Sequence, residues 1–331
     1  MHPHVRYDWT LLRAGRFLLD GGGMFGLIPK TVWSRFIDTD DRNRITLSHN
    51  ALLLRGGGRT VLIEAGTGDK LDAKMSDIFG LDGRTIEDAV IEAGVDPKDV
   101  HLNVVSHLHF DHAGGLTRRA RAGETPDWVA KGRQASGDQA EVCFTFPNAE
   151  VVVQRQEWLD AIANDSVMTR TYFADHLLPL EIPLVGEQPR LRLIESPIPF
   201  PHDQRPHRKD LPTSPVSNRR TEIAPGIWVF LVPGHTWGQQ AIMFEDMEGR
   251  TVVFTPDVMP THFHVGAAYS LGYDVEPYTS MVTKRWFLGE AADAGWHLVL
   301  DHEPGDAVQR VHRNDRGWFD LESTGLIGCN W

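Results

Sequence analysis

Four potential metal ligands lie within six consecutive residues of the segment SHLHFDHAGG, which follows an apolar, β-branched run at residues 102–105. In an extended segment, residues i and i+2 project to the same side, so the first two histidines can bind one ion together. The other two ligands fall where Gly114 and Gly115 let the chain turn, so they can reach a second ion. Burying four such groups without a cation or several hydrogen bonds would be costly. We therefore predict half of a two-metal hydrolytic site, made by His107, His109, Asp111 and His112.

Four residues on one loop cannot enclose two ions, so further ligands must come from elsewhere in the chain. Three apolar, strand-like runs later in the sequence end in polar residues of suitable type. Loops beyond strand ends are where layered α/β folds place their chemistry. The candidates are His235 after residues 227–232, Asp257 after residues 251–254 and His302 after residues 297–300.

This ligand order resembles the metallo-β-lactamase superfamily, whose dinuclear members use an HxHxDH loop followed by a distant His, an Asp and a final His. The resemblance implies an α/β fold, the four-layer αβ/βα sandwich, in which two sheets pack together and helices cover the outside. It also implies one ion held by His107, His109 and His235, a second held by Asp111, His112 and His302, and Asp257 as the bridge. Since the ligands are all nitrogen and oxygen, zinc is the leading choice, with iron, manganese or cobalt as alternatives.

The segment TVLIEAGTG at residues 60–68 is similar to the strand and turn found near the N-terminus of that superfamily. The family usually has Asp where this chain has Glu64. The acid's role in the family is to hold the ligand loop by hydrogen bonds. We therefore expect Glu64 to contact the loop that carries the first four ligands.

A closer similarity is to the quorum-quenching N-acyl-homoserine lactonase branch, the YtnP-type proteins. It rests on DGGGMFG at residues 20–26, on the Pro and Trp-Ser-Arg positions at 29–35, and on DVMPTH at residues 257–262. The resemblance implies an N-acyl-homoserine lactone hydrolase. Branch membership specifies the fold and the metals far better than it specifies the substrate.

One position departs from the lactonase pattern. Well-studied homoserine lactonases have a Tyr three residues after the bridging Asp, where it polarises the lactone, but this chain has Pro260 there. If a lactone is the substrate, another donor must do that work. The candidates from nearby sequence are His262, His264 and Tyr273, and ordinary packing is the alternative for each.

The predicted activity is hydrolysis of a lactone or ester. Two cations about 3.5 to 4 Å apart lower the pKa of a shared water and supply hydroxide without a strong protein base. Asp257 would bridge the ions, and Asp111 is a further candidate to accept a proton from the water. The alternatives are hydrolysis of another ester, a thioester or a phosphotriester. A non-catalytic metal-binding protein is disfavoured, because a structural site normally closes on one tetrahedral ion.

Composition is consistent with an enzyme that acts on a small molecule. The formal net charge of −12 argues against a nucleic-acid partner, which would need a basic surface. The two cysteines, Cys143 and Cys329, form no disulfide framework and have no metal-type spacing. Neither a signal peptide nor a membrane-spanning apolar stretch is visible, so the cytoplasm is the expected location.

The pattern along the chain predicts one domain over residues 1–331, with strands alternating with helices. Helices are expected over Thr85–Ala93, Gln156–Ala163 and Thr279–Ala294, and a strand over Val151–Val153. Irregular insertions are expected near 117–141 and 197–221, the second with solvated histidines at 202 and 207. The apolar residues between Met24 and Phe36 fit either core packing or a wall of the substrate pocket or a homodimer contact.

Overall fold

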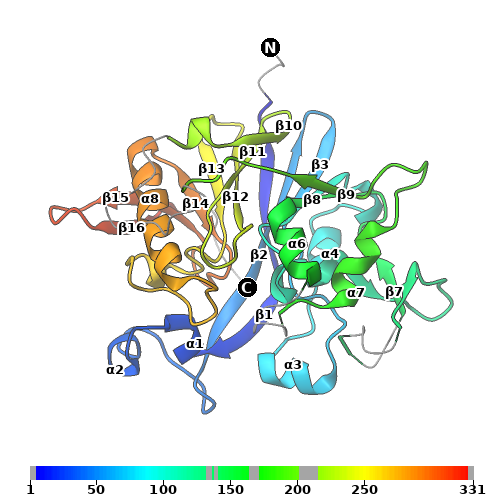
Figure 1. Cartoon of the computed structure of the whole chain (residues 1–331), viewed down its shortest axis with the longest axis horizontal. Helices are drawn as coiled ribbons and strands as arrows, with labels where there is room; N and C mark the ends of the chain where they lie inside the picture. Colours follow the sequence, from blue (N-terminus) through cyan, green and yellow to red (C-terminus); the bar gives the residue numbers. More distant parts are fainter. Residues whose placement is uncertain (1–4, 132–135, 138–140, 164–170, 201–214, 327–331) are drawn as a thin grey trace. The chain divides into compact units, whose positions relative to one another are not determined.

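The computed structural model describes residues 5–131, 136–137, 141–163, 171–200 and 215–326 (Figure 1). The chain divides into two compact units, which we describe separately. Unit 1 comprises Met1–Tyr7, Leu18–Leu47 and Glu195–Trp331, and unit 2 comprises Asp8–Phe17 and Ser48–Ile194.

Unit 2 is built around a six-stranded sheet with the strand order β1-β2-β3-β4-β8-β9. Strands β2 and β3 are antiparallel, whereas the pairs β3–β4, β4–β8 and β8–β9 are parallel. The last residues of β1 and the first residues of β2 are assigned to unit 1. The strands are β1 (Asp8–Asp20), β2 (Arg44–Gly56), β3 (Arg59–Ile63), β4 (Leu102–Val104), β8 (Glu150–Gln154) and β9 (Leu191–Ile194).

Helices α4 and α6 of unit 2 pack apolar side chains into one core with residues of the sheet, among them Leu62 and Val153. The helix predicted from Thr85 is confirmed as α4, and Thr85 and Asp88 form its N-terminal capping box. The expected strand at 151–153 and helix at 156–163 are confirmed as β8 and α6. The helical segments are α3 (Ala73–Phe79), α4 (Ile86–Glu92), η1 (Pro97–Asp99), α5 (Phe110–Ala113), η2 (Gly114–Leu116), α6 (Arg155–Ala163), α7 (Ala174–Leu177) and η4 (Leu178–Glu181).

The segment after the first ligand loop differs from the irregular insertion expected there. It contains a small antiparallel sheet in the order β5-β7-β6, formed by β5 (Thr117–Arg119), β7 (Glu141–Phe144) and β6 (Trp128–Val129). Polar contacts support it: the guanidinium of Arg118 binds the carboxylate of Glu124 through two hydrogen bonds of 2.7 and 2.9 Å. Strands of two to four residues are too short to show an apolar alternation in the sequence.

Unit 1 contains a seven-stranded sheet in sequential order from β10 to β16. All neighbouring pairs are antiparallel except β13–β14, which run parallel. The strands are β10 (Thr221–Ala224), β11 (Ile227–Leu231), β12 (Gln240–Glu245), β13 (Thr251–Thr255), β14 (His297–Leu300), β15 (Val308–Arg313) and β16 (Phe319–Ser323).

Helix α8 (Pro277–Ala294) confirms the helix predicted at 279–294. It ends at Gly295, which adopts the left-handed conformation with φ of 66° and caps the helix. Trp286 and Phe287 of α8 pack into one core with residues of the unit 1 sheet, such as Phe230 and Leu298. The shorter helices of unit 1 are α1 (Gly21–Phe25), α2 (Lys30–Trp33), η5 (Val216–Asn218) and η6 (His262–His264).

The apolar segment between Met24 and Phe36 is partly buried and partly exposed. Met24, Phe25 and Trp33 are buried, which fits the expected core packing, whereas Leu27 and Phe36 are exposed.

Cys143 is a buried free thiol, and Cys329 lies outside the described residues, as do His202 and His207 of the second expected insertion. None of the helices in the described ranges is both long and apolar enough to span a bilayer.

Candidate metal centre

The HxHxDH loop of unit 2 follows β4 and leads into helix α5. His109 is the extended residue that precedes the helix, with φ of −60° and ψ of 156°, so the backbone changes from extended to helical between His109 and Asp111. This is the change that the sequence predicted. All four candidate ligands of the loop are buried, and they are His107, His109, Asp111 and His112.

The four side chains of the loop form one cluster. His107 Nε2 lies 3.1 Å from His109 Nδ1, and the ring centroids of His107 and His112 are 3.9 Å apart. A carboxylate oxygen of Asp111 lies 3.9 Å from His112 Nε2. Ligands for two neighbouring ions must lie close together. The loop therefore fits the prediction that it supplies half of the ligands.

Glu64 fixes this loop from the end of β3, as expected. Its Oε1 accepts the backbone N–H of Ser106 at 2.7 Å, and its Oε2 lies 2.9 Å from His112 Nδ1. A proton on Nδ1 that is donated to this carboxylate makes Nε2 the ligand atom of His112. Glu64 adopts a positive φ of 71°, an uncommon conformation for a residue other than glycine. A second acid, Glu157 of α6, accepts the N–H of Leu108 at 2.9 Å.

In unit 1, the three remaining candidates follow the ends of β11, β13 and β14. Because β13 and β14 are parallel neighbours, the loops after them leave the same edge of the sheet. The carboxylate of Asp257 lies between two histidines: Oδ2 is 3.1 Å from His235 Nε2, and Oδ1 is 3.4 Å from His302 Nε2. Asp257 thus directs one oxygen to each imidazole.

Two further acids lie next to the unit 1 ligands, and sequence reasoning assigned a role to neither. Asp274 Oδ1 lies 2.9 Å from His235 Nδ1, and Asp301 Oδ2 lies 3.8 Å from His302 Nε2. Burial alone would lower the pKa of His235, but Asp257 and Asp274 outweigh burial and raise that pKa to about 10. The surroundings of His235 therefore favour a positive charge.

The three candidates for a substrate hydrogen-bond donor have different surroundings. His264 is buried, with Nδ1 2.8 Å from the Thr261 hydroxyl and Nε2 2.8 Å from the Met24 carbonyl oxygen. Both ring nitrogens of His264 are thus engaged by the protein. The hydroxyl of Tyr273 packs against Gly23, where an added Cβ would lie 2.1 Å from it.

His262 is partly exposed. Its side chain is 43% exposed, and its Nδ1 lies 2.6 Å from Oε2 of the buried Glu303. The same carboxylate oxygen accepts the backbone N–H of His262 at 3.1 Å. Glu303 directly follows His302 in the sequence, so the partly exposed imidazole of His262 is oriented by the residue next to a candidate ligand.

The chemistry of both residue sets fits divalent cations. Each unit buries imidazoles in contact with carboxylates, which is the donor set of zinc and related metals in catalytic sites. In unit 1, the ligand atoms of Asp257, Asp301 and His302 lie within 4.8 Å of one another, so one ion can contact all three. A cation would also neutralise the buried carboxylates, which are costly to bury alone.

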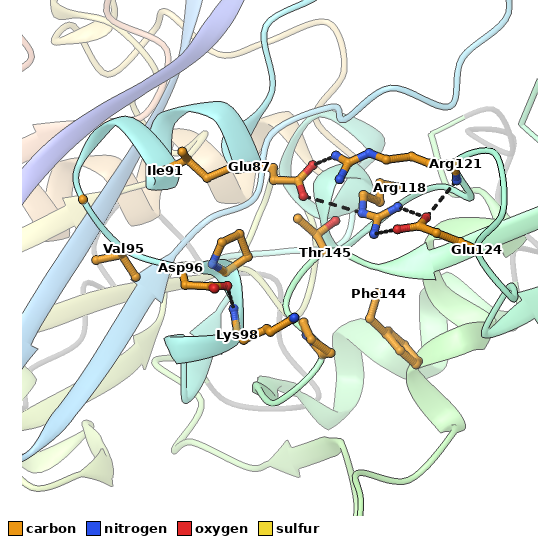
Figure 2. Close-up of a pocket in the computed structure, with 13 residues that line it drawn as sticks. Glu87, Ile91, Val95, Asp96, Lys98, Arg118, Arg121, Glu124, Phe144 and Thr145 are labelled. Carbon is orange, nitrogen blue, oxygen red and sulfur yellow. Dashed lines mark hydrogen bonds and ion pairs between the residues drawn. The ribbon is translucent and has the colours of Figure 1, made fainter.

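Unit 2 also has an open pocket with a volume of about 560 Å³, lined by residues from α4, η1, β5 and β7 (Figure 2). The side chain of Arg118 forms ion pairs with Glu87 and Glu124, and the side chain of Arg121 forms one with Glu87. The lining includes none of the predicted ligands or catalytic candidates. This pocket is therefore separate from the loop that carries the unit 2 ligands.

The fold and the buried His/Asp sets define a metal-dependent hydrolase. A profile of the family described as the metallo-beta-lactamase superfamily matches residues 44–291, which is most of the chain. The chain therefore belongs to the metallo-beta-lactamase superfamily. This confirms both the family resemblance and the prediction of an enzyme.

Solved structures with the same fold cover nearly the whole chain. A probable metal-dependent hydrolase from Staphylococcus aureus is 24% identical with a TM-score of 0.69, covering 96% of this chain and 98% of its own. AidC, a dizinc quorum-quenching lactonase solved with a homoserine product, is 14% identical with a TM-score of 0.66, covering 97% and 96%. The hydrolase AbOPH is 16% identical with a TM-score of 0.66, covering 99% and 97%.

At these identities the likeness shows the fold alone, and it confirms the predicted α/β fold of the metallo-β-lactamase type. A comparison with curated protein sequences gives no match.

Proposed function

We propose that the seven predicted ligands hold two divalent ions, and that the chain uses them to hydrolyse N-acyl-homoserine lactones. The observation that carries this proposal is the position of Asp257, which directs one carboxylate oxygen to His235 and the other to His302. A carboxylate placed in this way can bridge two ions. A site for a single structural ion would not need such a bridge.

The proposed ligand assignment follows the order of the family motif. His107, His109 and His235 would hold the first ion, Asp111, His112 and His302 the second, and Asp257 would join both. Glu64 supports this assignment because it orients His112, and Asp274 supports it because it orients His235. Zinc is the metal we propose for both positions.

When bound, two such ions activate water as a nucleophile and polarise the carbonyl group of the substrate. The chain's own part is to orient the ligands, to hold the substrate and to stabilise the leaving oxygen. We assign the last role to His262, because Glu303 holds its Nδ1 and the side chain is 43% exposed. Its Nε2 would then face the oxygen that develops charge as the lactone opens and donate a proton to it.

One observation favours a second candidate function. Pro260 occupies the position of the lactonase tyrosine, and its carbonyl oxygen accepts the N–H of His302 at 3.0 Å. The chain thus has no phenol at this point. A different ester, a thioester or a phosphotriester is the alternative substrate class.

A substrate panel on protein of measured metal content tests both candidates. The panel contains acyl-homoserine lactones of several chain lengths, aryl esters, thioesters and phosphotriesters. We expect the highest kcat/KM on the lactones, loss of activity with a chelator, and its return with zinc. Higher activity on another class would select the alternative function. The absence of any metal-dependent cleavage would refute both.

Three further expectations from the sequence remain predictions. These are a single domain, a cytoplasmic location and a homodimer. Sedimentation of the purified chain tests the homodimer directly.

A further inference from the structure

Lys70 of unit 2 is a buried cation that the proposed reaction does not use. It lies in the loop after β3, and only 1% of the residue is exposed. Burial of an ammonium group is costly unless the group is paired and hydrogen-bonded. Burial lowers the pKa of Lys70 to about 8, although the nearby carboxylates Asp175 and Asp69 act in the opposite direction.

The Lys70 ammonium binds the chain just after the HxHxDH loop. Its Nζ donates to the carbonyl oxygen of Thr117 at 2.6 Å and to that of Gly114 in a short contact. These carbonyls lie at the two ends of the turn η2, which continues directly from helix α5. The last carbonyls of a helix lack partners within it, and a cation placed there also interacts favourably with the helix dipole.

Backbone contacts align the Lys70 loop with the ligand segment. Ala65 N–H donates to the His112 carbonyl at 3.0 Å, and Gly115 N–H donates to the Gly66 carbonyl at 2.9 Å. The approach is close, because a Cβ on Gly114 would lie 2.1 Å from the Thr67 carbonyl oxygen. A shift of the Lys70 loop would therefore move the helix that carries the ligands.

We propose that Lys70 is a positioning residue for the metal centre. The lysine caps the α5–η2 turn and so holds Asp111 and His112 at the spacing that an ion requires. This inference rests on the proposed function, since it takes these two residues to be ligands. His107 and His109 precede α5 in the extended part of the loop. Lys70 therefore acts mainly on the second ion.

The test compares Lys70→Met with a matched control, Arg190→Met. Methionine keeps the length and the apolar stem of lysine but removes the ammonium group. Arg190 is also a buried cation of unit 2, and it donates to two carbonyls, those of Phe146 at 3.4 Å and Ala149 at 3.3 Å. Neither of these carbonyls lies in the ligand loop.

Each full-length variant is stripped of metal and titrated with Co²⁺ and Zn²⁺ against a chromophoric chelator, at a temperature where circular dichroism shows it folded. For Lys70→Met we expect one of the two ions to bind about 10- to 100-fold more weakly, as when a supporting partner of a ligand is lost. The cobalt absorption spectrum of that site should change as well. Arg190→Met should bind both ions like the wild type.

Unchanged affinities and an unchanged cobalt spectrum in Lys70→Met would overturn the inference while leaving the proposed function intact. An equal loss of metal in Arg190→Met would also overturn it, because general destabilisation would then explain the effect. A wild-type chain that binds no metal refutes the proposed function and the inference together. If Lys70→Met does not fold, Lys70→Gln replaces it, and wild-type affinity in that variant overturns the inference.

Discussion

The two ligand sets are built in opposite ways. In unit 2 the four candidates come from one loop. Glu64 and Glu157 accept backbone N–H groups of that loop, and Lys70 donates to a carbonyl just after it. In unit 1 the three candidates come from three separate strand ends. There the support reaches individual side chains, as with Asp274 on His235.

This difference has a consequence for how each set responds to damage. A support of the loop acts on several ligands at once, because they share one backbone. A support in unit 1 acts on one ligand, because the next one belongs to another strand. Substitutions of the supporting residues can therefore test this difference, because those in unit 2 should affect several ligands and those in unit 1 only one.

The largest effect is expected from Asp257→Ala, which removes the residue that lies between His235 and His302 in unit 1. Metal content and hydrolysis should fall together, and kcat/KM should fall by about a thousandfold, since such an ion supplies several kcal/mol of transition-state stabilisation. Elemental analysis and steady-state kinetics measure both. Asp315→Ala, at an exposed acid of unit 1, is the control. Full turnover in Asp257→Ala would defeat the bridging role.

A matched pair of substitutions tests the comparison itself. Glu64 and Asp274 each accept one backbone N–H and contact one histidine, but the N–H bound by Glu64 belongs to the ligand loop, at Ser106. Glu64→Gln should therefore weaken both ions, and Asp274→Asn only one, each by about 10- to 100-fold. Competitive metal titration measures this. Equal patterns in the two variants would contradict the proposed difference between the sets.

Effects of similar or smaller size are expected at the loop after Asp257. Pro260→Tyr should raise lactone turnover if the missing phenol is limiting. His262→Ala should lower kcat on lactones by about a hundredfold if its ring stabilises the leaving oxygen. If Pro260→Tyr changes nothing while lactone activity is already high, another donor suffices. Wild-type turnover in His262→Ala would exclude His262 as that donor.

The smallest effect concerns pH, and it compares one buried lysine in each unit. Burial lowers the pKa of both Lys70 and Lys284 to about 8, whereas the ordinary pKa of lysine, which holds in the unfolded chain, is 10.5. Between these values the unfolded chain binds more protons, so the free energy of unfolding should rise with pH from about 8 to 10.5. Lys70→Met and Lys284→Met should each flatten this rise. Urea unfolding of the metal-free chain at several pH values measures it.

The four ligands of the HxHxDH loop could be predicted from the sequence, because their spacing alone places them together. The helices α4 and α8 could be predicted as well, since Thr85, Asp88 and Gly295 mark their ends. The strand ends that carry the unit 1 ligands were visible, but the proximity of Asp257 and His302 depends on the parallel pairing of β13 and β14. That pairing is a property of the fold.

The supporting residues could not all be found in this way. Glu64 was expected through the family motif, whereas Asp274 lies 39 residues from the histidine it contacts, with no local signal. Lys70 is similar, because a lysine in a polar loop is normally exposed. Its burial follows from the close approach of the loop to Gly114, which depends on tertiary packing.

The path of the chain between the units has a consequence for synthesis on the ribosome. Unit 2 is complete once residue 194 has been made, but unit 1 combines early residues with everything after position 195. Tyr7, for example, pairs with Asp246. The first translated residues of unit 1 must therefore wait for most of the polypeptide to emerge. Neither unit is one uninterrupted segment, so a single recombination event between related genes cannot exchange it.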